Sequence, residues 1–93
     1  MASQRLSRDL TVINAHGLHA RSGALLAKTA NQFESEVMLE KNGQSVNGKS
    51  IMGVLMLAAS QNSVITVVIE GQDAEAAMKA IATLFEAGFY ETP

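Results

Sequence analysis

The sequence predicts a single α+β domain in which a mostly antiparallel sheet carries its helices on one face. Three observations lead to this prediction. A chain of 93 residues allows one domain. Strand-like and helix-like segments follow one another in the order β-α-β-β-α-β-α, and both long helical segments have a single apolar stripe. Helices of that kind cover one side of a sheet and leave its other side to water.

The first strand is expected over residues 6–13, where apolar side chains share one face at a period of two. A turn follows at 14–18. From about residue 20 to residue 32 the apolar positions recur at intervals of three and four, which predicts a helix.

A hairpin is expected next. Residues 35–41 alternate between apolar and polar side chains, and Asn42-Gly43 is a dipeptide typical of a tight hairpin turn. A short strand over residues 44–47 should therefore return beside the preceding one.

The segment of residues 48–60 has a less regular pattern. Ser50 can cap a short helix, but the residues from Ile51 to Leu57 form an apolar run with no clean polar face. One short helix cannot bury all of them in a domain of this size, so part of the run is expected on the surface.

The last third of the chain predicts a strand and a helix. Residues 63–69 are almost all β-branched and should form a central strand. Asp73 is placed to cap a final helix of about 15 residues, whose apolar stripe is the clearest in the chain. The residues 90–93 are expected to fray.

The composition argues against several classes of function. The net charge is −2 and aromatic residues make up 4% of the chain, so nucleic-acid binding has little support. The absence of cysteine removes disulfides, thiolate chemistry and the common structural zinc sites, and it fits a reducing compartment. We see neither a signal-peptide pattern nor a membrane-spanning stretch, so we expect a cytoplasmic protein without membrane insertion.

The stretch "HGLHARSG", residues 16–23, has the residues best suited to chemistry. His19 falls where a turn meets a helix, and the unpaired N–H groups and dipole of a helix start attract an anion. The same positive end favours the neutral imidazole, which is its nucleophilic form. Arg21 can hold phosphate oxygens in a planar fork. This combination indicates a phosphohistidine formed on His19.

Other interpretations of these residues stay open. A lone histidine and arginine at this spacing are more often an ordinary helix start and a solvated charge. His16 and His19 could form a metal pair, but no cysteine exists and the nearest upstream carboxylate is Asp9, so no metal site is predicted. Ser22 cannot be placed against His19 as a hydrolytic partner, and His16 is expected to be a surface loop residue. Ser50 is either a plain helix cap, which the sequence alone favours, or a phosphate acceptor.

Three segments resemble the HPr family, the histidine-containing phosphocarriers of the bacterial phosphoenolpyruvate-dependent phosphotransferase system. "GLHAR" at 17–21 is similar to the active-site signature, and "VNGKSIMGVLMLAAS" at 46–60 to the regulatory-serine segment with its helix. "GQDAEAAMKAIATLF" at 71–85 is similar to the approach to the last helix. The similarity runs from about residue 8 to residue 88, so residues 1–93 are expected to form one such domain. It implies an open-faced β-sandwich, with four antiparallel strands ordered 1-4-2-3 and three helices on one face.

The resemblance also implies roles for particular residues. His19 would accept a phosphoryl group on Nδ1 from phospho-enzyme I and pass it to sugar-specific IIA proteins, while Arg21 would steady the group. Ser50 would match the serine that HPr kinase/phosphorylase modifies. Such a protein is a carrier rather than an enzyme, needs no cofactor or metal, and is expected to be a monomer. The residues expected to form its docking surface are Ala20, Ala24, Lys28, Ile51, Met52 and Leu55.

One departure from the family pattern affects the helix start. The signature usually continues with proline and alanine, whereas this chain has Ser22-Gly23, so a looser first turn is expected. The ending "LFEAGFYE" resembles the nitrogen-related paralogue NPr, but "NGKSIMG" is more similar to the sugar-branch proteins that the serine kinase modifies. Some relatives without the active histidine act only as regulatory binding modules, and the presence of His19 favours the carrier.

Overall fold

The computed structural model describes residues 3–91, and within them the elements follow the predicted order. Their bounds are β1 (Gln4–Thr11), α1 (Ala20–Ala30), β2 (Glu36–Lys41), β3 (Gln44–Asn47), α2 (Ile51–Met56), β4 (Val64–Gly71), α3 (Ala74–Glu86) and the short 3-10 helix η1 (Gly88–Tyr90). In this part of the chain, no helix has both the length and the apolar character needed to cross a membrane.

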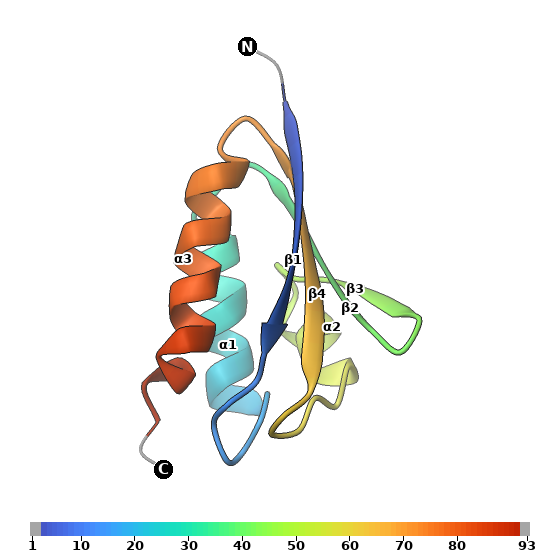
Figure 1. Cartoon of the computed structure of the whole chain (residues 1–93), viewed down its shortest axis with the longest axis vertical. Coiled ribbons are helices and arrows are strands. Elements are labelled where there is room, and N and C mark those ends of the chain that lie inside the picture. Colours follow the sequence, from blue (N-terminus) through green and yellow to red (C-terminus); the bar gives the residue numbers. More distant parts are fainter. Residues whose placement is uncertain (1–2, 92–93) are drawn as a thin grey trace.

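The four strands form one antiparallel sheet in the order β1-β4-β2-β3 (Figure 1). This confirms the topology that the family resemblance implies. β4 pairs with β1 on one side and with β2 on the other. Its residues Ile65, Val67 and Ile69 are fully buried, which explains why this strand is so rich in β-branched residues.

The β2–β3 hairpin has the turn that its sequence predicts. Asn42 and Gly43 have φ values of 52° and 82°. Positive φ at both central residues is the geometry of the tight hairpin turn that favours an Asn-Gly pair.

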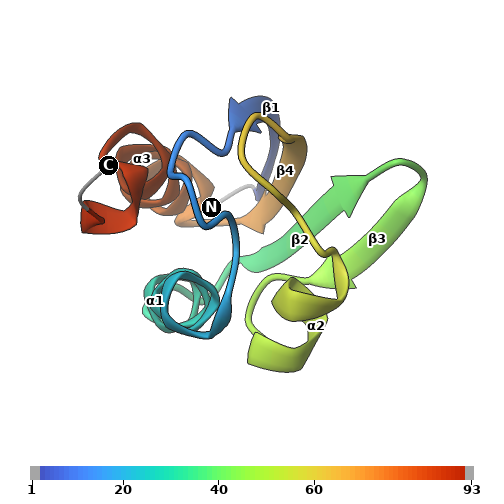
Figure 2. The same ribbon diagram turned by 90° about the horizontal axis from the view of Figure 1, so that it is seen from below.

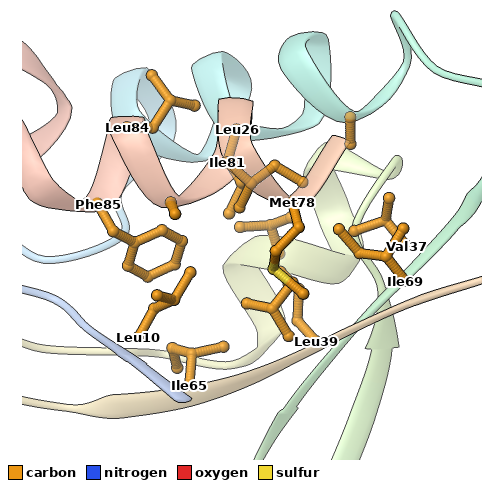
Figure 3. Packing of buried hydrophobic residues seen from close by; sticks show 14 of the residues in the cluster. Leu10, Leu26, Val37, Leu39, Ile65, Ile69, Met78, Ile81, Leu84 and Phe85 are labelled. Atoms are coloured by element: carbon orange, nitrogen blue, oxygen red, sulfur yellow. The ribbon is translucent and has the colours of Figure 1, made fainter. Parts of the chain in front are cut away.

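The three α-helices lie on the same side of the sheet, and α1 contacts both α2 and α3 (Figure 2). The core fills the space between the two layers, where Met78, Ile81 and Phe85 of α3 face the sheet (Figure 3). Full burial of one such side chain contributes about 1.5–3 kcal/mol, so this layer largely determines the stability of the domain.

The beginning of α3 differs from the expectation. Asp73 precedes the helix as predicted, but its carboxylate accepts hydrogen bonds from the backbone N–H groups of Glu34 and Ser35, at 3.0 Å each, and from the Ser35 hydroxyl. No cap bond from the Asp73 side chain to α3 is found in this part of the structure. Asp73 therefore ties the α1–β2 connection to α3 instead of capping the helix.

The segment after α3 also differs from the expectation. Gly88, Phe89 and Tyr90 have φ values of 59°, 54° and 60°, so the helix ends at Glu86 and the chain leaves the helical path. Phe89 is fully buried, and its ring lies 5.1 Å from that of Phe85. This burial offsets the cost of the left-handed backbone, about 1–2 kcal/mol for each residue other than glycine. The expected fraying is wrong for Tyr90 and Glu91, while residues 92–93 lie outside the described part of the chain.

Candidate functional site

His19 occupies the N-cap position of α1, with φ −110° and ψ −171°. This confirms the predicted placement at the junction of a turn and a helix. The side chain is 39% exposed, so a partner protein can reach the imidazole. The first turn of α1 follows directly and carries Arg21, whose side chain is 53% exposed.

The loop before His19 is held by a buried hydroxyl. Ser22 Oγ donates to the carbonyl oxygen of Gly17 at 2.8 Å and accepts from the backbone N–H of His19 at 3.0 Å. Gly17 has a φ of 67°, and a Cβ there would lie 2.3 Å from the carbonyl oxygen of Ala59, so only glycine fits. The two hydrogen bonds of the Ser22 hydroxyl thus hold this turn where the family has proline, and the looser first turn stays a prediction.

Gly23 sets the distance between the first two helices. A Cβ at this position would lie 3.1 Å from Leu55 Cδ2 and 3.5 Å from Val54 Cγ1. The glycine thus allows α2 to pack closely against the beginning of α1.

Glu91 reaches the site from the other end of the chain. Its Oε2 lies 2.5 Å from His19 Nε2 and accepts a hydrogen bond from Arg21 Nη1 at 3.0 Å. Its Oε1 accepts from Asn14 Nδ2 at 2.8 Å. The hydrogen bond from Asn14 is the largest cause of a lowered pKa of Glu91, which the neighbouring His19 and Arg21 lower further against the opposing effect of burial.

Two more residues complete the surroundings of His19. The side chain of Asn14 is buried, and its Nδ2 also donates to the carbonyl oxygen of Gly17 at 2.9 Å. His16 is exposed, as expected, and its ring lies edge-on to that of His19 with centroids 5.8 Å apart. Among residues 3–91 there is no group of three or more His, Cys, Asp or Glu side chains that could hold a metal ion.

Sequence reasoning predicts the position of His19 and Arg21 at the helix start, but it does not predict that the side chains of Glu91 and Asn14 lie beside them. Glu91 is 72 positions from His19, and its segment has no periodic pattern that could reveal the contact. Asn14 suggests only a turn.

Ser50 is the N-cap of α2, and its Oγ accepts a hydrogen bond from the backbone N–H of Gly53 at 3.1 Å. This confirms that Ser50 caps the short helix. Beyond Ser50, Ile51 and Met52 are 47% and 71% exposed, whereas Leu55 is half-buried. This confirms that part of the apolar run lies on the surface.

The expected docking residues of α1 lie close to that patch. Ala20 and Lys28 are exposed, and Ala24 is half-buried. Because α1 contacts α2, these residues and the apolar residues of α2 flank a common part of the molecule (Figure 2).

An accessible histidine at a helix start, beside an arginine on an open-faced α+β sandwich, is the arrangement expected of a small histidine phosphocarrier domain. The sequence matches the family described as "PTS HPr component phosphorylation site" over residues 6–87. The chain therefore belongs to the HPr family of the phosphotransferase system.

Individual relatives agree with the family match. A phosphocarrier protein HPr from Xylella fastidiosa (strain Temecula1) is 51% identical over 86 residues, which cover 92% of this chain and 97% of the relative. The crystal structure of HPr-C-His from Thermoanaerobacter tengcongensis has a TM-score of 0.91 and 41% identity, and covers 95% of this chain and 99% of that one. A structure described as an HPr dimer from the same organism has a TM-score of 0.75 and 47% identity, with coverages of 81% and 86%. The chain is accordingly a phosphocarrier protein and not an enzyme.

Proposed function

We propose that His19 accepts a phosphoryl group from phospho-enzyme I and passes it to the IIA components of sugar transporters. The observation that carries this proposal is the position of His19, exposed at the N-cap of α1 and two residues before Arg21. The first backbone N–H groups of α1 and the guanidinium provide positive charge where the phosphoryl group would sit. In the unphosphorylated protein Arg21 Nη1 donates to the Phe89 carbonyl oxygen and to Glu91, and the guanidinium has further N–H groups that can donate to a phosphoryl group.

Both partners would dock on one surface, formed by the beginning of α1 and by α2. Ile51 and Met52 supply exposed apolar area on α2, which packs against α1. Methionine is flexible and polarisable, which suits a surface that has to fit several partners in turn. Ala20, Ala24, Lys28 and Leu55 would surround this apolar centre.

We further propose that Ser50 is a regulatory phosphorylation site, used by a kinase of the HPr kinase/phosphorylase type. Support comes from its place at the edge of the docking surface, directly before Ile51. A phosphate there adds close to two negative charges beside the apolar residues that partners must approach.

We propose that the protein acts in the cytoplasm as a single, monomeric HPr domain that neither binds nucleic acid nor inserts into membranes. One relative is described as a dimer. Light scattering at micromolar concentration measures the molar mass and so distinguishes a monomer from a dimer. Pairing with sugar-branch or nitrogen-branch enzyme I and IIA proteins distinguishes the HPr branch from the NPr branch.

The function is tested by incubation with phosphoenolpyruvate and enzyme I, followed by mass spectrometry and an acid-lability assay. We expect one acid-labile phosphoryl group on the wild type, none on His19→Ala, and near-normal labelling of His16→Ala. Full labelling of the His19→Ala variant would overturn the assignment.

A further inference from the structure

Glu91 lies outside residues 6–87, the part of the chain that matches the HPr family. It nevertheless makes the shortest side-chain contact of His19, 2.5 Å from Nε2. We propose that Glu91 is a positioning residue, which holds the proton of the imidazole on Nε2 and offsets the positive charge that the ring gains when Nδ1 is phosphorylated. This inference deepens the proposed role of His19 and rests on it.

The contact defines which ring nitrogen is available. A carboxylate accepts a hydrogen bond but cannot donate one, so the proton of the neutral ring is assigned to Nε2. The lone pair is then on Nδ1, the atom that the family resemblance assigns as the acceptor. An aligned carboxylate has this effect on histidines in other proteins, where it fixes the tautomer and the orientation of the ring.

Three groups hold the carboxylate in place. Asn14 Nδ2 binds one oxygen at 2.8 Å, while His19 and Arg21 share the other. Asn14 is itself oriented by its second bond, to Gly17. The side chain of Glu91 is only 10% exposed, so this is a packed arrangement rather than a loose surface pair. The lowered pKa of Glu91 agrees with a carboxylate that stays ionised.

The backbone after α3 supports the same arrangement. The helix ends before the left-handed residues at 88–90, and the buried ring of Phe89 anchors the segment against Phe85. In Figure 1 the chain after α3 lies at the same end of the molecule as the beginning of α1. The anchored segment thus brings the carboxylate to the imidazole.

The transfer step shows where the charge matters. The lone pair of His19 Nδ1 attacks the phosphorus of the donor phosphohistidine, a bond between Nδ1 and phosphorus forms, and the bond to the donor nitrogen breaks. Its electron pair remains on the donor ring. The His19 ring then carries a phosphoryl group on Nδ1 and a proton on Nε2, so it is cationic, and the Glu91 carboxylate beside Nε2 stabilises that cation. Onward transfer returns the electron pair to Nδ1.

Two variants separate the charge of Glu91 from its size. Glu91→Gln keeps the size and removes the charge, and Glu91→Ala removes both. We expect the rate constant of phosphorylation at saturating phospho-enzyme I to fall by roughly 10- to 100-fold in both, by analogy with the loss of a carboxylate that orients a metal-binding histidine. The half-saturating concentration of enzyme I should not change, because Glu91 is not part of the proposed docking surface. Glu86 has an exposed carboxylate at the end of α3. The Glu86→Gln variant is therefore the matched control and should behave as the wild type.

A spectroscopic measurement tests the contact without any phosphoryl transfer. The ¹⁵N shifts of the neutral His19 ring should report a proton on Nε2 in the wild type and a mixture of tautomers in Glu91→Ala. An unchanged tautomer in that variant, or an unchanged rate in both variants, would contradict the proposal. Faster phosphorylation would also contradict it, by showing that Glu91 chiefly keeps Arg21 from the phosphoryl group. Labelling of His19→Ala would instead refute the proposed function and leave the tautomer result standing.

Discussion

The hydroxyl of Ser22 accepts a hydrogen bond from the backbone N–H of His19, with an O···N distance of 3.0 Å. The same hydroxyl donates to the carbonyl oxygen of Gly17, and Ser22 is fully buried. The HPr signature usually has proline at this position, which stiffens the backbone but offers no hydroxyl. In this chain, the hydrogen bonds of Ser22 help to fix the loop that precedes His19.

Replacement of Ser22 by alanine should therefore destabilise the protein and loosen the site. The variant leaves the N–H of His19 and the carbonyl of Gly17 without this partner in a buried place, which costs about 1–3 kcal/mol. Chemical denaturation measures the loss in the free energy of unfolding. Ser45→Ala, at an exposed position of β3, should change it by less than about 0.5 kcal/mol. Equal effects of the two substitutions would show that the Ser22 hydrogen bonds contribute nothing.

Arg21 should matter for transfer much more than for folding. Its guanidinium is 53% exposed, so its pair with Glu91 contributes at most about 1 kcal/mol to stability. As a stabiliser of the transferred phosphoryl group, however, it should be worth one to three orders of magnitude in rate. Rapid-quench kinetics with phospho-enzyme I measure the transfer rate of Arg21→Ala. Arg8 is exposed on β1, so Arg8→Ala is the control. Normal transfer by Arg21→Ala would rule out this role.

The sequence predicts those parts of the protein that depend on local patterns. The element order follows from periodicity, the hairpin from Asn42-Gly43, and the position of His19 and Arg21 from the helix start that they occupy. Glu91 could not be found in this way, because its contact with His19 depends on the left-handed backbone after α3 and on the burial of Phe89. These are tertiary effects between segments that are far apart along the chain.

The acid stability of the protein should depend on Glu91. The folded state lowers the pKa of Glu91 below its ordinary value of 4.5, chiefly through the hydrogen bond from Asn14. A carboxyl group with a depressed pKa adds stability above its unfolded pKa, and that contribution is lost as the pH falls through the folded pKa. The free energy of unfolding should thus decline below about pH 4.5, and it should decline less in Glu91→Gln.

Denaturation curves between pH 7 and pH 3 measure this difference. Asp73→Asn provides a second comparison, since hydrogen bonds from Ser35 and Glu34 also lower the pKa of Asp73. In each variant the free energy of unfolding should decline less at acid pH than in the wild type. If the Glu91→Gln variant had the same pH dependence as the wild type, the folded state would not favour the ionised form of Glu91 over the protonated form more than the unfolded state does.

Phosphorylation of Ser50 should weaken docking to enzyme I without unfolding the protein. Ser50 Oγ caps α2 through the N–H of Gly53, and the exposed residues Ile51 and Met52 follow at once. A phosphate at this point leaves the core untouched, but a partner that covers the apolar residues must approach a strongly hydrated dianion. We expect Ser50→Asp to keep its melting temperature within a few degrees and to accept phosphate from enzyme I much more slowly.

Calorimetry with enzyme I decides between regulation and a simple cap. Ser50→Ala removes the cap and should cost about 1 kcal/mol of stability while binding enzyme I normally. Ser45→Asp adds the same charge as Ser50→Asp at an exposed position of β3 that is not among the proposed docking residues, and it should bind like the wild type. A dianion beside Ile51 must weaken binding if enzyme I covers that part of the surface. Equal affinities of enzyme I for the unmodified and the Ser50-phosphorylated protein would therefore show that Ser50 does not control this interface.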